Sequence, residues 1–226
     1  MSRPSRFDDR ARYRIPSDPV KRAIDLLVAA VGLLAGAPVL AVVALAVARG
    51  LGRPVLFRQQ RPGRDGRPFV LVKFRTMREA DPAAGLVSDA DRLTPLGRWL
   101  RSTSLDELPT LWNVLRGEMS LVGPRPLLMQ YLDRYTPEQA RRHEVRPGIT
   151  GLAQVSGRNA LDWNSRLAAD VEYADRRSLG LDLRILARTV GSVLGRRGIA
   201  APGQATMAEF TGSPETDPAG PAGTPA

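Results

Sequence analysis

Residues 21–50 read KRAIDLLVAAVGLLAGAPVLAVVALAVARG, an apolar segment that constrains how the rest of the chain is arranged. From Ala23 to Ala48 the segment carries one charged residue, Asp25, and one proline, Pro38. A helix needs roughly 20 apolar residues to cross the hydrocarbon core of a bilayer. The segment is therefore long enough to enter a membrane.

Three interpretations of this segment compete. A cleaved signal peptide has an apolar region of only about 7–15 residues, which is shorter than this one. A simple span carries its basic residues mainly on the cytoplasmic flank, but here both flanks are basic. We favour a re-entrant helix-break-helix that kinks at Ala37 and Pro38 and returns to the same leaflet, because proline removes a backbone donor and bends a helix. An ordinary kinked span is the alternative.

The composition removes several classes of catalytic site. The chain has no cysteine and one histidine, His143, so disulfides, thiolate zinc sites and cysteine nucleophiles are excluded. A Ser-His-Asp triad or a histidine metal site is disfavoured for the same reason. The net charge of +10 favours an anionic partner, which could be nucleic acid, a phosphorylated ligand or an anionic membrane surface.

The predicted fold class is α+β and mostly helical. We divide the chain into a flexible basic arm (1–20), the re-entrant membrane hairpin (21–50), a compact domain (51–211) and a disordered tail (212–226). The tail is rich in Pro, Gly and Ala and buries too little apolar surface to become ordered.

Three segments of the domain have recognisable patterns. Residues 55–77, VLFRQQRPGRDGRPFVLVKFRTM, predict a β-hairpin that turns at Asp65 and Gly66. The glycine-rich residues 146–159, RPGITGLAQVSGRN, are expected to form a loop. Residues 181–198 predict an amphipathic helix that either lies on the membrane surface or packs on the core, with an apolar face of Leu183, Leu186, Val190 and Val193.

The chemistry concentrates in residues 101–126, RSTSLDELPTLWNVLRGEMSLVGPRP, where two adjacent acids begin a helical pattern. One interpretation is purely structural. Ser104 and Glu107 fit a capping box, in which each side chain satisfies a free backbone amide at the start of a helix. Acids are also favoured there by the helix dipole.

The surrounding cations favour a functional interpretation. Arg101 and Arg125 bracket the two acids, and Lys73 and Arg75 alternate along the predicted strand, which should point both to one face. A diphosphate site needs guanidinium groups for the phosphate oxygens and carboxylates for a divalent ion. An aspartate carboxylate can itself serve as the nucleophile in phosphoryl transfer.

An ordered set of motifs resembles the bacterial sugar transferase family, and more narrowly its small, PglC-type monotopic phosphoglycosyl transferases acting on polyprenyl phosphate. The motifs run from about Lys21 to Gly212: the apolar segment with its central proline, FRQQRPG, KFRTM, residues 101–126 and RPGITGLAQVSGRN. The resemblance implies transfer of a sugar 1-phosphate from a UDP-sugar to undecaprenyl phosphate, with release of UMP. This reaction would initiate exopolysaccharide, lipopolysaccharide or glycoconjugate assembly.

The resemblance also implies roles for individual residues. Asp106 corresponds to the nucleophile that forms a covalent aspartyl-phosphosugar intermediate and to the ligand of Mg²⁺, and Glu107 activates or positions the lipid phosphate. The residues that correspond to substrate-binding positions are Lys73, Arg101 and Arg125 on the phosphates, and Arg158 and Asn159 on the nucleotide side. Relatives often have Ser-Pro at the membrane break, where this chain has Ala37 and Pro38.

The partners implied are a UDP-sugar, undecaprenyl phosphate and the bacterial inner (cytoplasmic) membrane, with the catalytic domain on its cytoplasmic face. A homodimer or downstream glycosyltransferases would also be compatible, and no nucleic-acid partner is expected. The alternative function is that of a membrane-tethered basic protein that binds nucleic acid or anionic lipid through its arginine excess.

Overall fold

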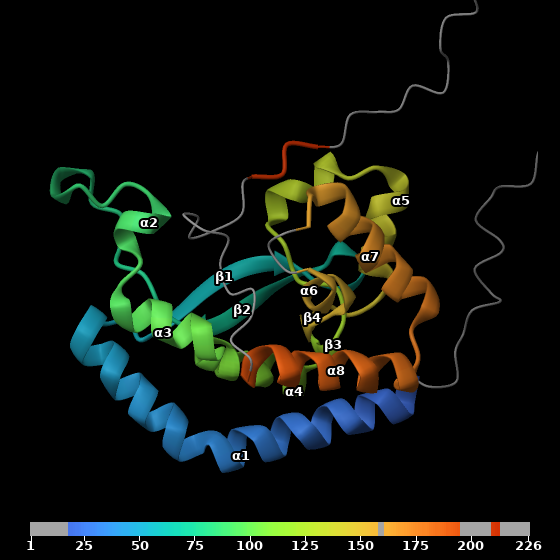
Figure 1. Cartoon of the computed structure of the whole chain (residues 1–226), viewed down its shortest axis with the longest axis horizontal. Helices are drawn as coiled ribbons and strands as arrows, with labels where there is room; N and C mark the ends of the chain where they lie inside the picture. The colour runs from blue at the N-terminus through green and yellow to red at the C-terminus, as the bar shows by residue number, and fades with distance from the viewer. Residues whose placement is uncertain (1–17, 158–160, 195–208, 213–226) are drawn as a thin grey trace, which may run out of the picture.

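A computed structural model describes residues 18–157, 161–194 and 209–212 (Figure 1). Its longest element is the helix α1, Asp18–Leu51, which lies along one side of the molecule and is bent near its middle. Helical backbone continues through Ala37 and Pro38. The break expected there is therefore a bend within one continuous helix. Proline removes one backbone donor, and the flanking alanines, leucines and valines maintain helical backbone on both sides of it.

Most of the apolar surface of α1 faces away from the rest of the protein. The helix is long and apolar enough to cross a membrane, and only 11% of its apolar window is buried. Ala29, Val43 and Val47 are its buried apolar contacts with the domain. The outward-facing apolar side chains are Val20, Ile24, Leu26, Leu27, Val28, Val31, Leu34, Val39, Val42 and Leu45.

The predicted β-hairpin is confirmed. Strands β1 (Leu56–Pro62) and β2 (Pro68–Phe74) are antiparallel, and the register pairs Phe57 with Lys73. The connection passes through the short 3-10 helix η2 (Arg64–Gly66), where Asp65 and Gly66 both have positive φ, at 57° and 71°. Aspartate and glycine tolerate this left-handed conformation, which explains the turn position.

Arg75 follows β2, which ends at Phe74, and its side chain contacts a different part of the molecule from that of Lys73. The Arg75 guanidinium instead donates to the carbonyl oxygens of Leu51 and Gly52, the latter at 2.7 Å. A cation at the carboxyl end of a helix satisfies free carbonyl groups and complements the helix dipole. Arg75 thus joins the end of α1 to the end of β2.

The segment after the hairpin is a series of short helices. Thr94 caps one of them, α3, by accepting a hydrogen bond from the Gly97 amide at 3.0 Å, with Pro95 in its first turn. The elements are η3 (Pro82–Ala84), α2 (Asp89–Arg92), α3 (Pro95–Thr103), η4 (Leu105–Thr110) and α4 (Leu111–Arg116).

The described part of the glycine-rich segment, residues 146–157, is not simply a loop, contrary to expectation. Strand β4 (Gly148–Thr150) pairs in parallel with β3 (Ser120–Val122), and α6 (Leu152–Ser156) follows it. The glycines allow two backbones to approach closely, since a Cβ atom on Gly148 would lie 2.1 Å from the Gly123 amide nitrogen. Three-residue strands are also too short to produce a period-2 pattern.

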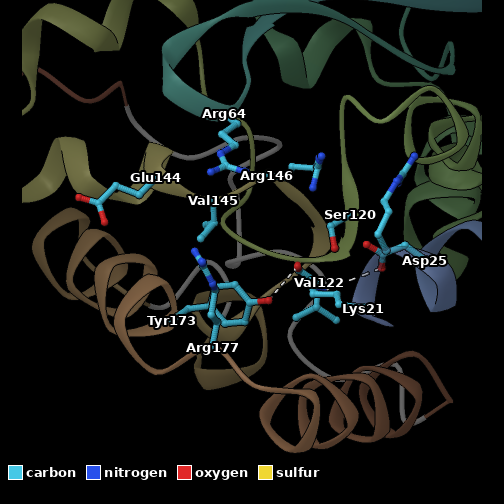
Figure 2. Close-up of a pocket in the computed structure, with 11 residues that line it drawn as sticks. Lys21, Asp25, Arg64, Ser120, Val122, Glu144, Val145, Arg146, Tyr173 and Arg177 are labelled. Atoms are coloured by element: carbon cyan, nitrogen blue, oxygen red, sulfur yellow. Dashed lines mark hydrogen bonds and ion pairs between the residues drawn. The ribbon is translucent and has the colours of Figure 1, made fainter. Parts of the chain in front are cut away.

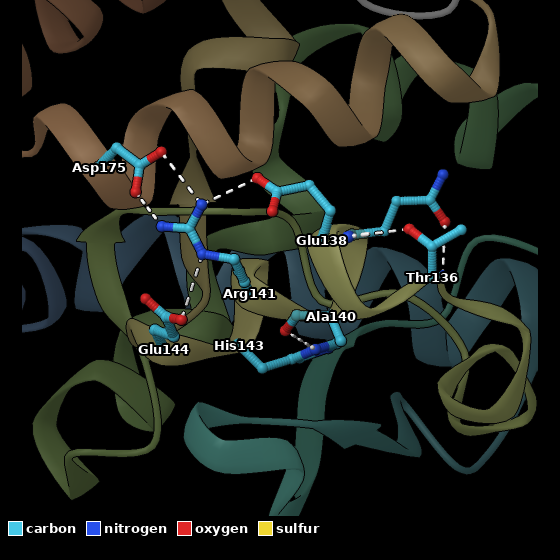
Figure 3. A network of polar contacts seen from close by, with 8 residues as sticks. Thr136, Glu138, Ala140, Arg141, His143, Glu144 and Asp175 are labelled. Carbon is cyan, nitrogen blue, oxygen red and sulfur yellow. Dashed lines mark hydrogen bonds and ion pairs between the residues drawn. The ribbon is translucent and has the colours of Figure 1, made fainter. Parts of the chain in front are cut away.

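The next helices, η5 (Met129–Arg134), α5 (Pro137–Ala140) and η6 (Arg141–Glu144), are fixed by polar contacts. Thr136 and Gln139 form the capping box that starts α5. Figure 3 shows the Arg141 guanidinium between Glu138, Glu144 and Asp175 of α7 (Trp163–Arg176), so one side chain joins three elements.

The predicted amphipathic helix is confirmed as α8 (Leu179–Leu194), although its inward face differs from the expected one. Ile185 is buried in a core with Leu121, Val122, Val145 and Tyr173, and Leu186 packs against this cluster. Leu183 and Val190 are exposed. The side chain of Val193 lies outside the described residues.

We predict that Gly97→Ala destabilises the protein strongly, because its Cβ would lie 1.9 Å from the Thr76 carbonyl oxygen. An overlap with backbone cannot be relieved by rotating a side chain, so the expected loss is on the order of 3 kcal/mol or more. The matched control is Gly191→Ala in α8, where nothing lies within 4 Å and alanine should raise helix stability slightly. Denaturant unfolding of both variants would contradict this account if they were equally stable.

Candidate active site

Asp106 is placed by a sharp change of direction between α3 and η4. Ser104, which joins the two helices, has the left-handed conformation φ 57°, ψ 16°. The turn directs the Asp106 side chain inward, where the residue is 4% exposed. Among the described residues, its carboxylate accepts no hydrogen bond and forms no ion pair. A buried carboxylate with unoccupied oxygens is unusual, because burial of a charge normally requires a partner.

The capping box expected from Ser104 and Glu107 is not formed. The Ser104 side chain makes no capping hydrogen bond, since its own backbone conformation turns it away from the helix start. The Glu107 carboxylate instead accepts a hydrogen bond from Arg125 Nη2 at 2.6 Å. The structural interpretation of this acid pair is therefore wrong for Glu107, whose partner is 18 residues away.

Hydrogen bonds to the free edge of β2 hold this segment in place. The Asn113 side chain donates to the Val70 carbonyl oxygen at 2.7 Å and accepts from the Val72 amide at 3.1 Å. The Thr110 hydroxyl donates to the Val72 carbonyl oxygen at 3.0 Å. These contacts fix η4 and α4 against the strand that carries Lys73.

Lys73 and Arg101 complete the cationic surroundings. The Lys73 ammonium lies 5.3 Å from the centre of the Phe57 ring on the neighbouring strand. Arg101 Nε donates to the Thr76 hydroxyl at 3.1 Å, next to the close contact between Thr76 and Gly97. Thus α3 and the segment that follows β2 together fix the position of the Arg101 guanidinium.

The two acids have opposite pKa shifts. Burial raises the pKa of Asp106, and the negative charge of Glu107 raises it further, while the nearby cations offset part of the increase. Burial also acts to raise the pKa of Glu107, but the charge and hydrogen bond of Arg125 dominate and the pKa is lowered. The surroundings thus stabilise the ionised form of Glu107 and destabilise the ionised form of Asp106.

The same charges and the same burial shift the pKa values of the neighbouring cations. The negative charge of Glu107 raises the pKa of Arg125. Burial lowers the pKa of Lys73, and the charge of Arg125 lowers it further, with Asp106 and Glu107 acting in the opposite direction. The structure therefore brings together Lys73, Arg101, Asp106, Glu107 and Arg125, the five cluster residues singled out from the sequence. Arg158 and Asn159 lie outside the described residues.

Arg142 is a supporting residue that the sequence did not reveal. Its Nη2 donates to the Arg125 carbonyl oxygen at 2.7 Å, and the same nitrogen lies 2.6 Å from Asp170 Oδ2. Both members of this ion pair are almost fully buried. The partners are 28 residues apart, on η6 and α7, so no local pattern indicated them.

Arg61 is a second such residue. Burial, together with the charge of Arg125, lowers the pKa of Arg61 to about 10. Its guanidinium donates to Gln59 at 2.6 Å. Arg61 therefore adds positive charge close to Arg125, in the FRQQRPG motif.

Comparisons with known proteins identify the family of this chain. The family model described as bacterial sugar transferase matches residues 16–196. The chain belongs to the bacterial sugar transferase family. The resemblance inferred from the motifs is thereby confirmed, as is the prediction of an enzyme of the phosphoglycosyl transferase class.

Relatives in this family include short and long proteins. The uncharacterized sugar transferase EpsL of Bacillus subtilis is 53% identical over 196 residues, which cover 86% of this chain and 96% of that protein. The UDP-glucose:undecaprenyl-phosphate glucose-1-phosphate transferase of Caulobacter vibrioides is 46% identical over 192 residues, covering 80% of this chain and 72% of the relative. The undecaprenyl-phosphate glucose phosphotransferase of Komagataeibacter xylinus is 44% identical over 185 residues, covering 75% of this chain but 35% of the relative.

Proposed function

We propose that the protein transfers a sugar 1-phosphate from a UDP-sugar to undecaprenyl phosphate, with Asp106 as the nucleophile. The observation that carries this proposal is the state of the Asp106 carboxylate. It is buried, accepts no hydrogen bond from the described residues and has cations around it. The names of the relatives, two of which specify undecaprenyl phosphate as acceptor, support the substrate class. A nucleic-acid or lipid binder would give this carboxylate no role.

In the first step, an Asp106 oxygen attacks the phosphorus that bears the sugar. A new bond forms between this oxygen and phosphorus, and the bond to the UMP oxygen breaks, so UMP leaves with the electron pair. In the second step, an oxygen of undecaprenyl phosphate attacks the same phosphorus and displaces the carboxylate. The products are a polyprenyl-diphospho-sugar and regenerated Asp106.

The charged neighbours support both steps. Arg125, Arg101 and Lys73 would offset the negative charge of the diphosphate as it approaches a carboxylate. The lowered pKa of Glu107 makes this group a weak base, and its bond to Arg125 suits a positioning role. Arg142 would in turn hold Arg125 through the backbone carbonyl.

Magnesium fits this site. Mg²⁺ is usually bound by one or two carboxylates together with substrate phosphates and water, and the open oxygens of Asp106 provide one such ligand. No group of three acidic, histidine or cysteine ligands exists among the described residues, so most of the ligands would be substrate and water. When bound, the ion would neutralise the charge that develops on the phosphates.

The membrane arrangement is part of the same proposal. The exposed apolar face of α1 would lie in the bilayer, and the exposed side chains of Trp99 and Trp112 would anchor α3 and α4 at its interface. Basic residues flank the helix on both sides, which favours entry and return at one leaflet. The bend at Pro38 would allow this topology at the cytoplasmic membrane, with the domain on the cytoplasmic face. The product would enter a pathway of surface-glycan assembly.

We predict that Asp106→Asn lowers magnesium-dependent UMP release by at least about a hundredfold, because an amide is a poor nucleophile. Asp133→Asn is the matched control, since Asp133 is exposed on η5. Assays with undecaprenyl phosphate and a panel of UDP-sugars measure the effect. Near wild-type turnover by the Asp106 variant would contradict the covalent mechanism.

The same variant should be more stable than the wild type at neutral pH. Burial raises the pKa of Asp106 in the folded chain, so the stability that its protonated form contributes is present at low pH. This contribution is lost as the pH rises through the raised pKa. Asparagine cannot ionise, so thermal unfolding of Asp106→Asn should show a higher Tm at pH 7. A lower Tm would mean that the cations more than offset the burial.

The acid limb of the pH profile should respond to Glu107. Asp106 must be ionised to attack, so turnover should fall as the pH drops through its raised pKa. Glu107→Gln removes a negative charge that raises this pKa and releases Arg125 from its partner. The acid limb should therefore move to lower pH, even if the maximum rate is reduced. An unchanged or upward-shifted limb would show that Glu107 does not act on Asp106 electrostatically.

The absence of cysteine from the sequence makes the topology directly testable. Single cysteines placed at Asp18 and Arg53 mark the two flanks of the apolar segment. A membrane-impermeant maleimide should label neither site in intact cells and both sites after permeabilisation. Labelling of one flank alone in intact cells would instead establish a spanning helix.

A further inference from the structure

An open cavity of about 30 Å³ lies between the start of α1, strand β3, η6 and the end of α7 (Figure 2). Asp106 and the four charged residues around it do not line this cavity. Five basic residues do line it: Lys21, Arg22, Arg64, Arg146 and Arg177. The cavity is therefore a second concentration of positive charge, built from residues that the catalytic proposal does not use.

The carboxylates in its walls are occupied by other partners. Asp25 accepts a hydrogen bond from the Leu121 amide at 3.1 Å and lies 3.9 Å from Lys21. Glu144 lies 3.4 Å from Arg141 (Figure 3). Lys21 is itself paired with Asp182 at 2.7 Å. Both carboxylates are therefore already engaged, although the charge of Asp25 still partly offsets that of Arg22, and Arg64 lies 3.8 Å from Asp65.

Arg22 and Arg146 are the two arginines held most closely. Arg22 Nη2 donates to the Leu115 carbonyl oxygen at 3.2 Å, and Arg146 Nε donates to the Gly117 carbonyl oxygen at 3.0 Å. The positive charges of the two groups repel each other, and neither forms an ion pair with a carboxylate of the described residues. Arg22 Nη1 is buried without a hydrogen-bond partner. Two guanidinium groups anchored side by side in this way have free donors for an anion.

Ser120 provides a third donor, independent of the arginines. The residue is 1% exposed on β3, lines the cavity, and its hydroxyl has no hydrogen-bond partner. Figure 2 shows Ser120, Arg146 and Arg64 reaching the cavity from three different segments. A buried hydroxyl without a partner is costly to the folded state, so an acceptor bound in the cavity would remove a penalty as well as add a contact.

We propose that this cavity binds a phosphate group through Arg22, Arg146 and Ser120, with Arg64 at its solvent-facing rim. Donors that converge from separate segments suit a tetrahedral oxyanion, and guanidinium groups match phosphate oxygens in geometry and charge. The phosphate has two sources, the headgroup of an anionic phospholipid and free phosphate. The lipid source rests on the proposed membrane position of α1, because Arg22 lies in its second turn; the free-phosphate source does not.

The test uses the full chain and two separate probes. Inorganic phosphate is titrated against chloride at constant ionic strength, and nanodiscs of phosphatidylglycerol are compared with nanodiscs of phosphatidylcholine. Binding is followed by calorimetry and by the change in Tm. The variants are Arg146→Gln and Ser120→Ala, and the charge-matched control is Arg176→Gln, whose side chain is 74% exposed and paired with Glu172. Arg125→Gln reports any phosphate that binds at Asp106.

Each cavity variant should weaken binding of the effective probe about tenfold, the size expected for one lost hydrogen bond to a charged group. The control should bind like the wild type. A response to phosphatidylglycerol alone identifies a lipid headgroup, and a response to inorganic phosphate identifies a free-phosphate site. Equal binding of both probes by the cavity variants and the control would overturn the proposal, as would loss of all binding in Arg125→Gln alone.

Ser120→Ala keeps the test decisive if Arg146→Gln does not fold. Without ligand its Tm should equal or exceed that of the wild type, because the variant removes an unpaired buried hydroxyl. UMP release is measured on the same samples. Absence of UMP release in the wild type would refute the proposed function without affecting the binding result, so the two failures are distinguishable.

Discussion

The arrangement of the candidate active site depends on the side chain of Asn113. Its amide binds the free edge of β2 in the way a neighbouring strand would, donating to Val70 and accepting from Val72. The same amide donates to Glu118 at 2.7 Å, and the residue is fully buried. The segment that carries Asp106 and Glu107 is thereby fixed against the strand that carries Lys73, and the cations from α3 and residue 125 are placed around it.

The site combines charged groups that form ion pairs with one carboxylate, that of Asp106, that does not. Glu107 and Arg125 form a satisfied pair, and Arg142 with Asp170 holds the backbone of Arg125 from behind. Asp106 has no such partner, and burial together with the negative charge of Glu107 raises its pKa despite the cations around it. A reactive group whose pKa is shifted by its environment, and which is held by rigid neighbours, is typical of catalytic sites. A phosphate-bearing substrate would supply the charge interactions that the free protein lacks.

The sequence predicted features that depend on local pattern and composition. The β-hairpin, the long apolar helix and the acid-and-arginine cluster all followed from residues close together in the chain. Features formed by distant partners were missed or misread, such as Arg142 with Asp170, and Arg75 with the end of α1. Glu107 illustrates the limit well, since a capping box and an ion pair with Arg125 use the same residue, and only the fold distinguishes them. The parallel pairing of β3 with β4 was hidden because its glycines allow close backbone contact but also suggest a loop.

The most direct test of the account is the mass of the peptide that contains Asp106 after the enzyme is quenched during turnover with a UDP-sugar. The covalent mechanism predicts an added mass equal to the sugar phosphate on that peptide, formed without the lipid acceptor and lost when undecaprenyl phosphate is supplied. A preparation that releases UMP at its full rate but never carries this mass on Asp106 would contradict the covalent mechanism.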